Sequence, residues 1–225
     1  MMRRSVSWRA ALLLAALLAP ACVPAQQKPQ AAPGARSLAA AVDRHYDQLR
    51  SLKAAFSESY AGMGVNRTES GELLLQKPGK MRWDYSSPPG KIFLLDGKYA
   101  LFYTPGDAQV QRIPAKELDD LRSPLRFLLG HTNLEKEMSG LTLASGPNGE
   151  YVLTGIPKGQ ENRVSKLSLT VTAAGVIVGI EVDEMDGATT NFSFTGEEPN
   201  AAVSPRAFQF TPPAGVPIVD SPPPV

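Results

Sequence analysis

Few side chains in this sequence could do chemistry. His45 and His131 are the two histidines, Cys22 is the single cysteine, and neither histidine stands in a catalytic motif. The G-x-S-x-G, H-E-x-x-H and phosphate-loop patterns do not occur. One cysteine cannot form an intramolecular disulfide, and these three residues do not make a Cys/His zinc cluster. We therefore expect no catalytic residue, no metal, no cofactor and no enzymatic activity.

The charged residues also show no pattern of a catalytic site. Glu181, Asp183, Glu184 and Asp186 alternate or stand in a turn, which is typical of a solvated face rather than of an acid/base pair. The chain has 23 basic and 22 acidic residues, with a pI near 7.8. This balance gives no basic field for nucleic acid. The composition therefore favours a soluble globular protein with many turns and little room for metal chemistry.

The N-terminus has the pattern of a secretory signal peptide. Three arginines precede an unbroken apolar run over 10–19, which is shorter than the roughly 20 residues of a membrane-spanning helix. The small residues of Val23-Pro24-Ala25 fit cleavage after residue 25.

A second cleavage site remains open. Ala19-Pro20-Ala21-Cys22 resembles a lipobox, although leucine is more usual where Ala19 stands. In that case residues 1–21 are removed and Cys22 is lipidated. We otherwise expect a signal peptide over 1–25, a flexible tether over 26–36, one folded domain over 37–219 and a disordered proline-rich tail over 220–225.

A single apolar stripe follows this tether. Leu38, Val42, Tyr46, Leu49, Leu52 and Phe56 recur at spacings of three and four, and Ser37 can cap the first turn. The spacing predicts an amphipathic helix over 38–56 that needs a hydrophobic partner surface.

The period then changes to that of strands. Short runs bounded by Gly, Pro, Asp or Asn predict about eleven strands, over 71–76, 80–85, 91–95, 99–103, 109–113, 141–145, 150–154, 164–172, 176–183, 189–195 and 207–211. Most connections have hairpin length. In the second run Met81, Trp83 and Tyr85 share one face, whereas Arg82 and Asp84 share the other.

This pattern predicts a mainly β (α+β) fold, in which one curled antiparallel sheet forms an unclosed barrel. Ser123, Pro124 and Gly130 bound a short apolar helix over 125–129, too short to be stable alone. Its two interpretations are an ordinary core helix and a lid over an apolar cavity on the concave face.

One combination of blocks resembles a known family. The run over 71–85, which includes Lys77-Pro78-Gly79 and Arg82-Trp83-Asp84-Tyr85, is similar to the signature of the periplasmic lipoprotein carrier family, LolA. Phe208-Gln209-Phe210-Thr211-Pro212-Pro213 resembles the end of that family, and Leu169 to Gly175 also fits. The resemblance covers roughly residues 38–219.

The resemblance implies an unclosed barrel whose helices cover an apolar cavity for the acyl chains of lipoproteins. It implies a carrier in the periplasm that receives lipoproteins from an inner-membrane ABC-type exporter and delivers them to an outer-membrane receptor. We expect this carrier to be a monomer. It needs no covalent step, which agrees with the missing catalytic groups.

The resemblance also implies site residues. Lys77 stands where the family holds its lid with a basic residue, usually arginine; lysine lacks the planar fork of arginine, so we expect a weaker latch. The predicted cavity and lid residues are Trp83, Phe93, Leu95, Leu101, Tyr103, Leu125, Phe127, Leu128 and Leu129.

A lipidated Cys22 would change this prediction, because a diffusing carrier is not anchored. The alternative is a receptor-like protein of the same fold (LolB-like), or a tethered lipid-binding lipoprotein, held at the outer membrane through Cys22.

Overall fold

A single sheet dominates the computed structural model. The structure describes residues 33–116, 128 and 133–221, all within one compact unit that begins at Pro33. The predicted signal peptide with Cys22 lies outside the described residues, as do His131, Leu125, Phe127 and Leu129.

Within the described residues the sheet has twelve strands. They are β1 (Ser51–Gly62), β2 (Val65–Gln76), β3 (Lys80–Ser87), β4 (Pro89–Asp96), β5 (Tyr99–Tyr103), β6 (Val110–Pro114), β7 (Met138–Ser145), β8 (Tyr151–Pro157), β9 (Val164–Val171), β10 (Ile177–Glu184), β11 (Thr189–Pro199) and β12 (Ile218–Asp220). Their order across the sheet is β12-β6-β5-β4-β3-β2-β1-β11-β10-β9-β8-β7. Neighbours are antiparallel except for β12 and β6, which are parallel.

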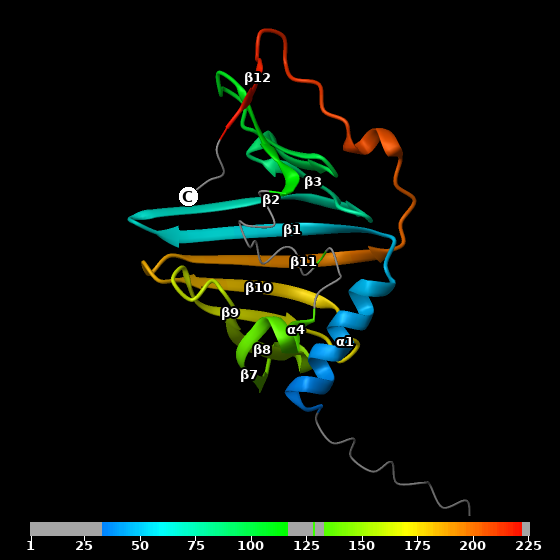
Figure 1. Cartoon of the computed structure of the whole chain (residues 1–225), viewed down its shortest axis with the longest axis vertical. Helices are drawn as coiled ribbons and strands as arrows, with labels where there is room; N and C mark the ends of the chain where they lie inside the picture. Colours follow the sequence, from blue (N-terminus) through cyan, green and yellow to red (C-terminus); the bar gives the residue numbers. More distant parts are fainter. Residues whose placement is uncertain (1–32, 117–127, 129–132, 222–225) are drawn as a thin grey trace, which may run out of the picture. The chain divides into compact units, whose positions relative to one another are not determined.

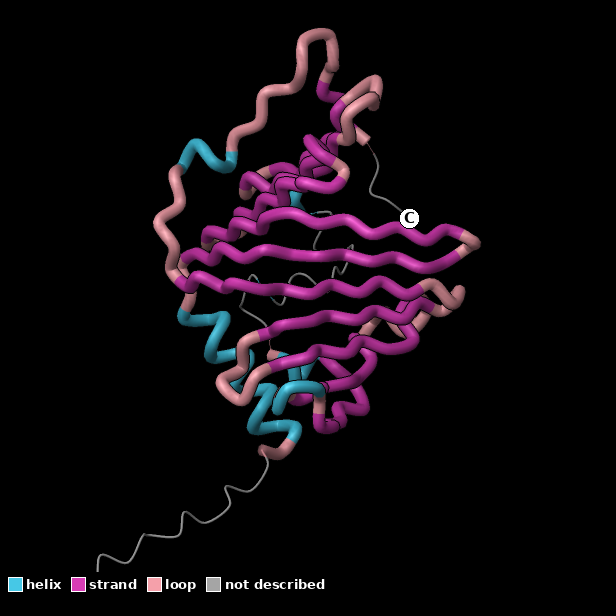
Figure 2. The backbone as a smooth tube through the Cα atoms, turned by 180° about the vertical axis from the view of Figure 1, so that it is seen from behind, coloured by secondary structure: helices cyan, strands magenta, loops and turns pink. Residues whose placement is uncertain are grey.

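The sheet curls without closing. Its two margins, β12 and β7, are not neighbours in the strand order. In Figures 1 and 2 the long strands β2, β1 and β11 run side by side, and the strands toward both margins turn out of their plane. Adjacent strands twist by about 20–25°, so a sheet this wide cannot remain flat. The predicted mainly β fold with one curled, unclosed sheet is confirmed.

The helix α1 (Ala35–Gln48) is shorter than the sequence predicts. Leu38, Val42 and Tyr46 form its buried stripe at the expected spacing. It begins before Ser37, with Gly34 as the N-cap and no side-chain cap. In Figure 1, α1 runs across the ends of β11, β10 and β9.

The residues after α1 form the central strand β1, which corrects the predicted helix over 38–56. Leu52 and Phe56 fit a helical spacing, but Leu52, Ala54 and Phe56 are also the buried apolar members of an alternating strand. Met63 and Gly64, with φ of 51° and 77°, turn the chain into β2. Because β1 pairs with both β2 and β11, its backbone hydrogen bonds are made along both edges.

The predicted strand over 207–211 is also absent from the sheet. This part contains a 3-10 helix, η2 (Pro205–Phe208), capped by the Ser204 side chain. We call residues 200–217 the C-terminal strap, because it leads from β11 back to β12 (Figure 1). Asp220, expected in the tail, is the last residue of β12 and pairs with Arg112 of β6.

Two other short helices are described, α4 (Leu134–Glu137) and η1 (Pro147–Gly149). The helix α4 contacts α1 and leads directly into β7.

Candidate functional site

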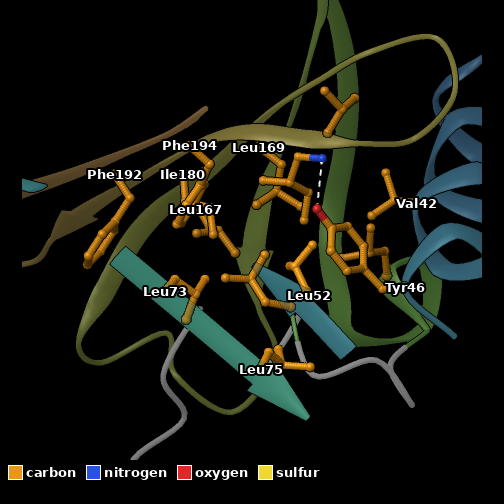
Figure 3. Close-up of a cluster of buried hydrophobic side chains, with 14 of the residues drawn as sticks. Val42, Tyr46, Leu52, Leu73, Leu75, Leu167, Leu169, Ile180, Phe192 and Phe194 are labelled. Atoms are coloured by element: carbon orange, nitrogen blue, oxygen red, sulfur yellow. Dashed lines mark hydrogen bonds between the residues drawn. The ribbon is translucent and has the colours of Figure 1, made fainter. Parts of the chain in front are cut away.

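The face of the sheet that carries Trp83, which we call the inner face, is apolar over most of its width. Its buried side chains pack with α1 in one cluster, which includes Leu52, Phe56, Leu73, Leu75, Met81, Trp83, Leu95, Leu153, Leu167, Leu169, Ile180, Phe192 and Phe194. Figure 3 shows many of them gathered opposite Val42 and Tyr46 of α1. The inner face therefore brings together strands from both halves of the chain.

Aromatic rings occupy the middle of the inner face. Trp83 is 1% exposed, and its ring lies edge-on at 4.5 Å from Phe56, 5.7 Å from Phe192 and 6.1 Å from Phe194 between centroids. Gly71 lies opposite Phe56, and a Cβ there would be 2.9 Å from the Phe56 ring. The same Cβ would lie 2.0 Å from the carbonyl oxygen of Asp84, so the missing side chain at Gly71 makes room for both the β3 backbone and the Phe56 ring.

The inner face is covered in this structure. Leu38, Val42 and Tyr46 of α1 pack onto it, and Leu128, which is 1% exposed, belongs to the same cluster. Leu128 is the one member of the predicted 125–129 helix that lies within the described residues. A ligand that used this surface would have to displace part of this cover.

Lys77 links the turn between β2 and β3 to the end of α1. Its ammonium group donates a hydrogen bond to the carbonyl oxygen of Tyr46, and its backbone N–H donates to the Arg50 carbonyl at 2.8 Å. Burial lowers the pKa of Lys77, and the nearby Asp47 opposes that shift. The structure thus places Lys77, the predicted latch residue, in contact with the end of α1.

A second set of bonds, which the sequence did not reveal, ties α1 to β11 and β10. His45 Nε2 lies 2.7 Å from one oxygen of Glu197, and the Tyr46 hydroxyl donates to the other at 3.2 Å. The same hydroxyl accepts the Ile177 N–H at 3.1 Å, which is the dashed line in Figure 3. Burial raises the pKa of Tyr46 far above its usual range, so the phenol stays protonated.

Asp43 makes a third link, between α1 and α4. Both of its carboxylate oxygens accept the Leu134 N–H, at 3.2 Å each. Burial raises the pKa of Asp43 to about 6, against the effect of this bond, while Asp47 and Glu137 add to the rise. The covering elements are therefore joined to one another as well as to the sheet.

The predicted cavity residues divide between the two faces. Phe93 and Leu95 lie opposite Trp83 and Met81 in the strand register and so share the inner face. Leu101 and Tyr103 lie opposite Leu94 and Ile92 and so point to the other face, which we call the outer face. Leu101 and Tyr103 pack there with Phe208 and Phe210 of the C-terminal strap. The structure therefore does not bring these two residues to Trp83.

The outer face also explains the charged half of the Arg82-Trp83-Asp84-Tyr85 block. The Arg82 guanidinium makes two bonds to Asp84, at 2.6 and 2.8 Å. It also donates to the carbonyl oxygens of Ala207 and Gln209, at 2.8 and 3.1 Å. Arg82 thus fixes the strap to β3.

One end of the inner face is charged, near the hairpin between β1 and β2. Glu58 and Glu69 are 8% and 7% exposed. Lys91 pairs with Glu69 and lies 4.3 Å above the Tyr85 ring, and the Tyr85 hydroxyl donates to Glu58 at 3.2 Å. Burial and the neighbouring Glu69 raise the pKa of Glu58. We call these side chains, with Arg67, the charged cluster; strand alternation could have placed them on one face, but their pairing could not be foreseen.

The described part of the chain offers no clustered metal ligands. Within these residues, no group of three or more His, Cys, Asp and Glu side chains could hold a metal ion. Among the described helices, none has the length and hydropathy of a membrane span.

Comparison with known proteins identifies the family. Residues 47–211 match the family described as "Outer membrane lipoprotein carrier protein LolA". This chain belongs to the LolA family. The resemblance seen in the sequence is thus confirmed, over a region that includes every strand of the sheet except β12.

Relatives in the LolA family match this chain over most of their length. The "Outer-membrane lipoprotein carrier protein" of Nitrosospira multiformis is 29% identical over 177 residues, which is 77% of this chain and 84% of that protein. The protein of the same name in Chromobacterium violaceum is 30% identical over 190 residues, which is 84% of this chain and 90% of that protein.

The fold is also found among solved structures. An "uncharacterized conserved protein" from Thermus thermophilus superposes with a TM-score of 0.54 at 11% identity, over 83% of this chain and 99% of that one. At this identity the likeness concerns the fold alone.

Proposed function

We propose that this LolA-family chain is a periplasmic carrier, which binds the acyl chains of lipoproteins on its inner face and transports them from the inner to the outer membrane. The observation that carries the proposal is the wide apolar inner face with its aromatic centre, covered by elements that polar links hold in place. The names of its relatives supply the cargo class.

The free energies of the interactions involved allow a ligand to replace the cover on the inner face. Burying one CH₂ group contributes about 0.8 kcal/mol, so one long acyl chain contributes on the order of 10 kcal/mol. A hydrogen bond within a protein contributes a net of about 1 kcal/mol. Lys77, Asp43 and His45 each supply such a link between α1 and its surroundings. An acyl chain can therefore outweigh these links, although it must also replace the apolar contacts of the cover.

In this proposal Lys77 is the latch, and the site has no covalent step. Inner-face residues Trp83, Phe93 and Leu95 contact the acyl chains, while the elements that hold Tyr46 and Leu128 move aside. A protein that works by apolar binding and release needs no catalytic group, so we propose no enzymatic activity. Its partners are the lipoproteins, an inner-membrane ABC-type exporter that loads it and an outer-membrane receptor that unloads it.

The binding test uses the emission of Trp83. The full chain carrying Trp8→Phe, in which Trp83 is the remaining tryptophan, is titrated with a synthetic peptide that bears a diacylglyceryl cysteine. The same peptide without acyl chains is the control. We expect saturable spectral change with the acylated peptide alone. No response to the acylated peptide, together with no lipoprotein co-purified from periplasmic extract, would refute the proposal.

The lipobox-like Ala19-Pro20-Ala21-Cys22 favours one alternative, a lipoprotein of the same fold anchored through Cys22. Mass spectrometry of the mature N-terminus separates the two. A chain that starts at Gln26 supports the diffusing carrier. A diacylglyceryl group on Cys22 would refute the diffusing carrier and support the anchored lipoprotein.

A further inference from the structure

Trp83 has an unusual feature within the inner face. Among the buried polar side-chain atoms of the described residues, Trp83 Nε1 has no hydrogen-bond partner. The side chain is 1% exposed, so water does not reach this N–H from outside. Buried polar groups are nearly always paired, because an unpaired donor loses its bonds to water without compensation. An unpaired donor at the centre of an apolar surface points to an acceptor supplied by a ligand.

Trp83 also stands at a boundary of polarity. Toward α1, its neighbours in register and on its own strand are Leu73, Leu75 and Met81, all buried and apolar. In the other direction, the ring centroids of Phe56 and Tyr85 lie 5.0 Å apart, and the Tyr85 hydroxyl donates a hydrogen bond to the Glu58 carboxylate. Along these strands, the side chains of the inner face thus change within a few residues from leucine to Trp83 and then to the charged cluster.

The charged cluster determines which way round an amphipathic ligand can bind across this boundary. An alkyl chain gains nothing by covering Glu58, Glu69 and Lys91, because it would strip water from charged groups without bonding to them. The polar part of an amphipathic ligand can approach them. In an acylated molecule, the carbonyl of the ester or amide linkage lies at the junction between the alkyl chain and the polar part.

We propose that the indole N–H of Trp83 donates a hydrogen bond to the carbonyl oxygen of the acyl linkage in the bound lipid. The alkyl chain then lies over Leu73 and Leu75, and the polar part points toward the charged cluster. Trp83 is thereby the residue that distinguishes acyl chains from alkyl chains and sets the orientation of the ligand. This inference rests on the proposed function, because it assumes that acyl chains bind to the inner face.

The test compares two ligands that differ in that carbonyl. One is the peptide with a diacylglyceryl cysteine, and the other is its dialkyl ether analogue, which keeps the chains but has no acyl carbonyl. Both are titrated, with a fluorescent label on the ligand, against the full chain, Trp83→Phe and Phe194→Leu. Trp83→Phe keeps an aromatic ring but removes the donor. Phe194→Leu, the matched control, changes apolar contact on the same face.

We expect Trp83→Phe to reduce the preference for ester over ether about five- to tenfold, as for the loss of one hydrogen bond. Phe194→Leu should weaken both ligands alike and leave the preference unchanged. An ester-to-ether preference that is the same with and without the indole N–H would overturn the assignment. If neither ligand binds any of the proteins, it is the proposed function that fails instead.

A spectroscopic measurement covers the case in which Trp83→Phe does not fold. In the otherwise native chain with Trp8→Phe, the ¹⁵N-labelled indole of Trp83 gives one side-chain signal. We expect its proton to move downfield with the ester ligand and to change much less with the ether ligand. Equal shifts with both ligands would contradict the hydrogen bond.

Discussion

Gly175 gives the sharpest test of whether α1 is the movable cover. It lies in the turn between β9 and β10, with a φ of 88°. A Cβ at this position would lie 2.5 Å from the carbonyl carbon and oxygen of Ala41 and 2.7 Å from the nitrogen of Val42. These atoms are backbone of α1, so a methyl group in Gly175→Ala cannot be accommodated by a side-chain rotation.

The size of the effect can be worked out from this geometry. Ordinary van der Waals contact begins at 3.4 Å, so α1 and the turn must separate by about 1 Å, which for overpacked sites costs roughly 1–3 kcal/mol. Positive φ at a residue with a Cβ adds about 1–2 kcal/mol. We expect Gly175→Ala to lower the free energy of unfolding by about 2–5 kcal/mol.

Gly187 supplies a matched control. Its φ is 87°, nearly that of Gly175, and a Cβ there would meet no atom within 4 Å. Gly187→Ala therefore carries the backbone cost alone, about 1–2 kcal/mol. The difference between the two variants in urea unfolding isolates the contact with α1.

Gly175→Ala should strengthen ligand binding even though it lowers the stability of the fold. If the ligand binds only when α1 is displaced, the apparent affinity falls with the fraction of molecules that are open. Each 1.4 kcal/mol removed from the cost of opening then raises affinity about tenfold. We expect Gly175→Ala to bind the acylated peptide about tenfold more tightly than Gly187→Ala, with faster hydrogen exchange in 35–48. Equal affinity and equal exchange in the two variants would refute the role of α1 as the cover.

Three further predictions concern the polar links. Lys77→Met should hold the acylated peptide severalfold more tightly in titration, because the covered state loses about 1 kcal/mol; Lys80→Met, at the first residue of β3, should not. Burial raises the Asp43 pKa from 3.8 to about 6, so the folded state binds this proton more tightly than the unfolded state, and stability is lost as pH rises from 3.8 through about 6. Asp43→Asn, which can still accept the Leu134 N–H, should therefore be more stable in urea unfolding at pH 7 by about 1 kcal/mol after allowance for solvent, but not at pH 4. Arg82→Met should lower stability by about 2 kcal/mol and speed hydrogen exchange in 205–210, with ligand affinity unchanged. Equal ligand affinity of Lys77→Met and Lys80→Met would contradict the latch role of Lys77. A stability effect of Asp43→Asn that does not change with pH would contradict the raised pKa of Asp43. Unchanged hydrogen exchange in the strap of Arg82→Met would contradict the role of Arg82 in holding the strap.

Much of the fold could be predicted because alternation and turn residues are local signals. The strands from β3 to β6 and from β7 to β11 lie close to their predicted ranges, since Gly, Pro and Asp separate them in the sequence. The spacing predicts a helix where β1 lies because Leu52 and Phe56 satisfy both periods. What decides between the periods is the pairing of β1 with β11, which lies far away in the chain.

The site was less predictable for the same reason. The links that hold the cover join residues distant in sequence, such as His45 with Glu197 and Asp43 with Leu134. Leu101 and Tyr103 are as hydrophobic as the inner-face residues and alternate in the same way. Their face depends on the register between β4 and β5 and on the strap that covers them, neither of which periodicity can supply.

The alternation of the Arg82-Trp83-Asp84-Tyr85 block assigns two roles to one strand. Trp83 and Tyr85 face inward, to the apolar surface and the charged cluster, while Arg82 and Asp84 face outward and hold the strap. A slip of one residue would move every side chain to the opposite face, bringing a guanidinium into the leucine cluster and the indole under the strap. The four residues therefore fix the register of β3 more strongly than an apolar strand could. That fixed register places Trp83 between the leucines and the charged cluster, which is the position that the proposed hydrogen bond to a ligand carbonyl requires.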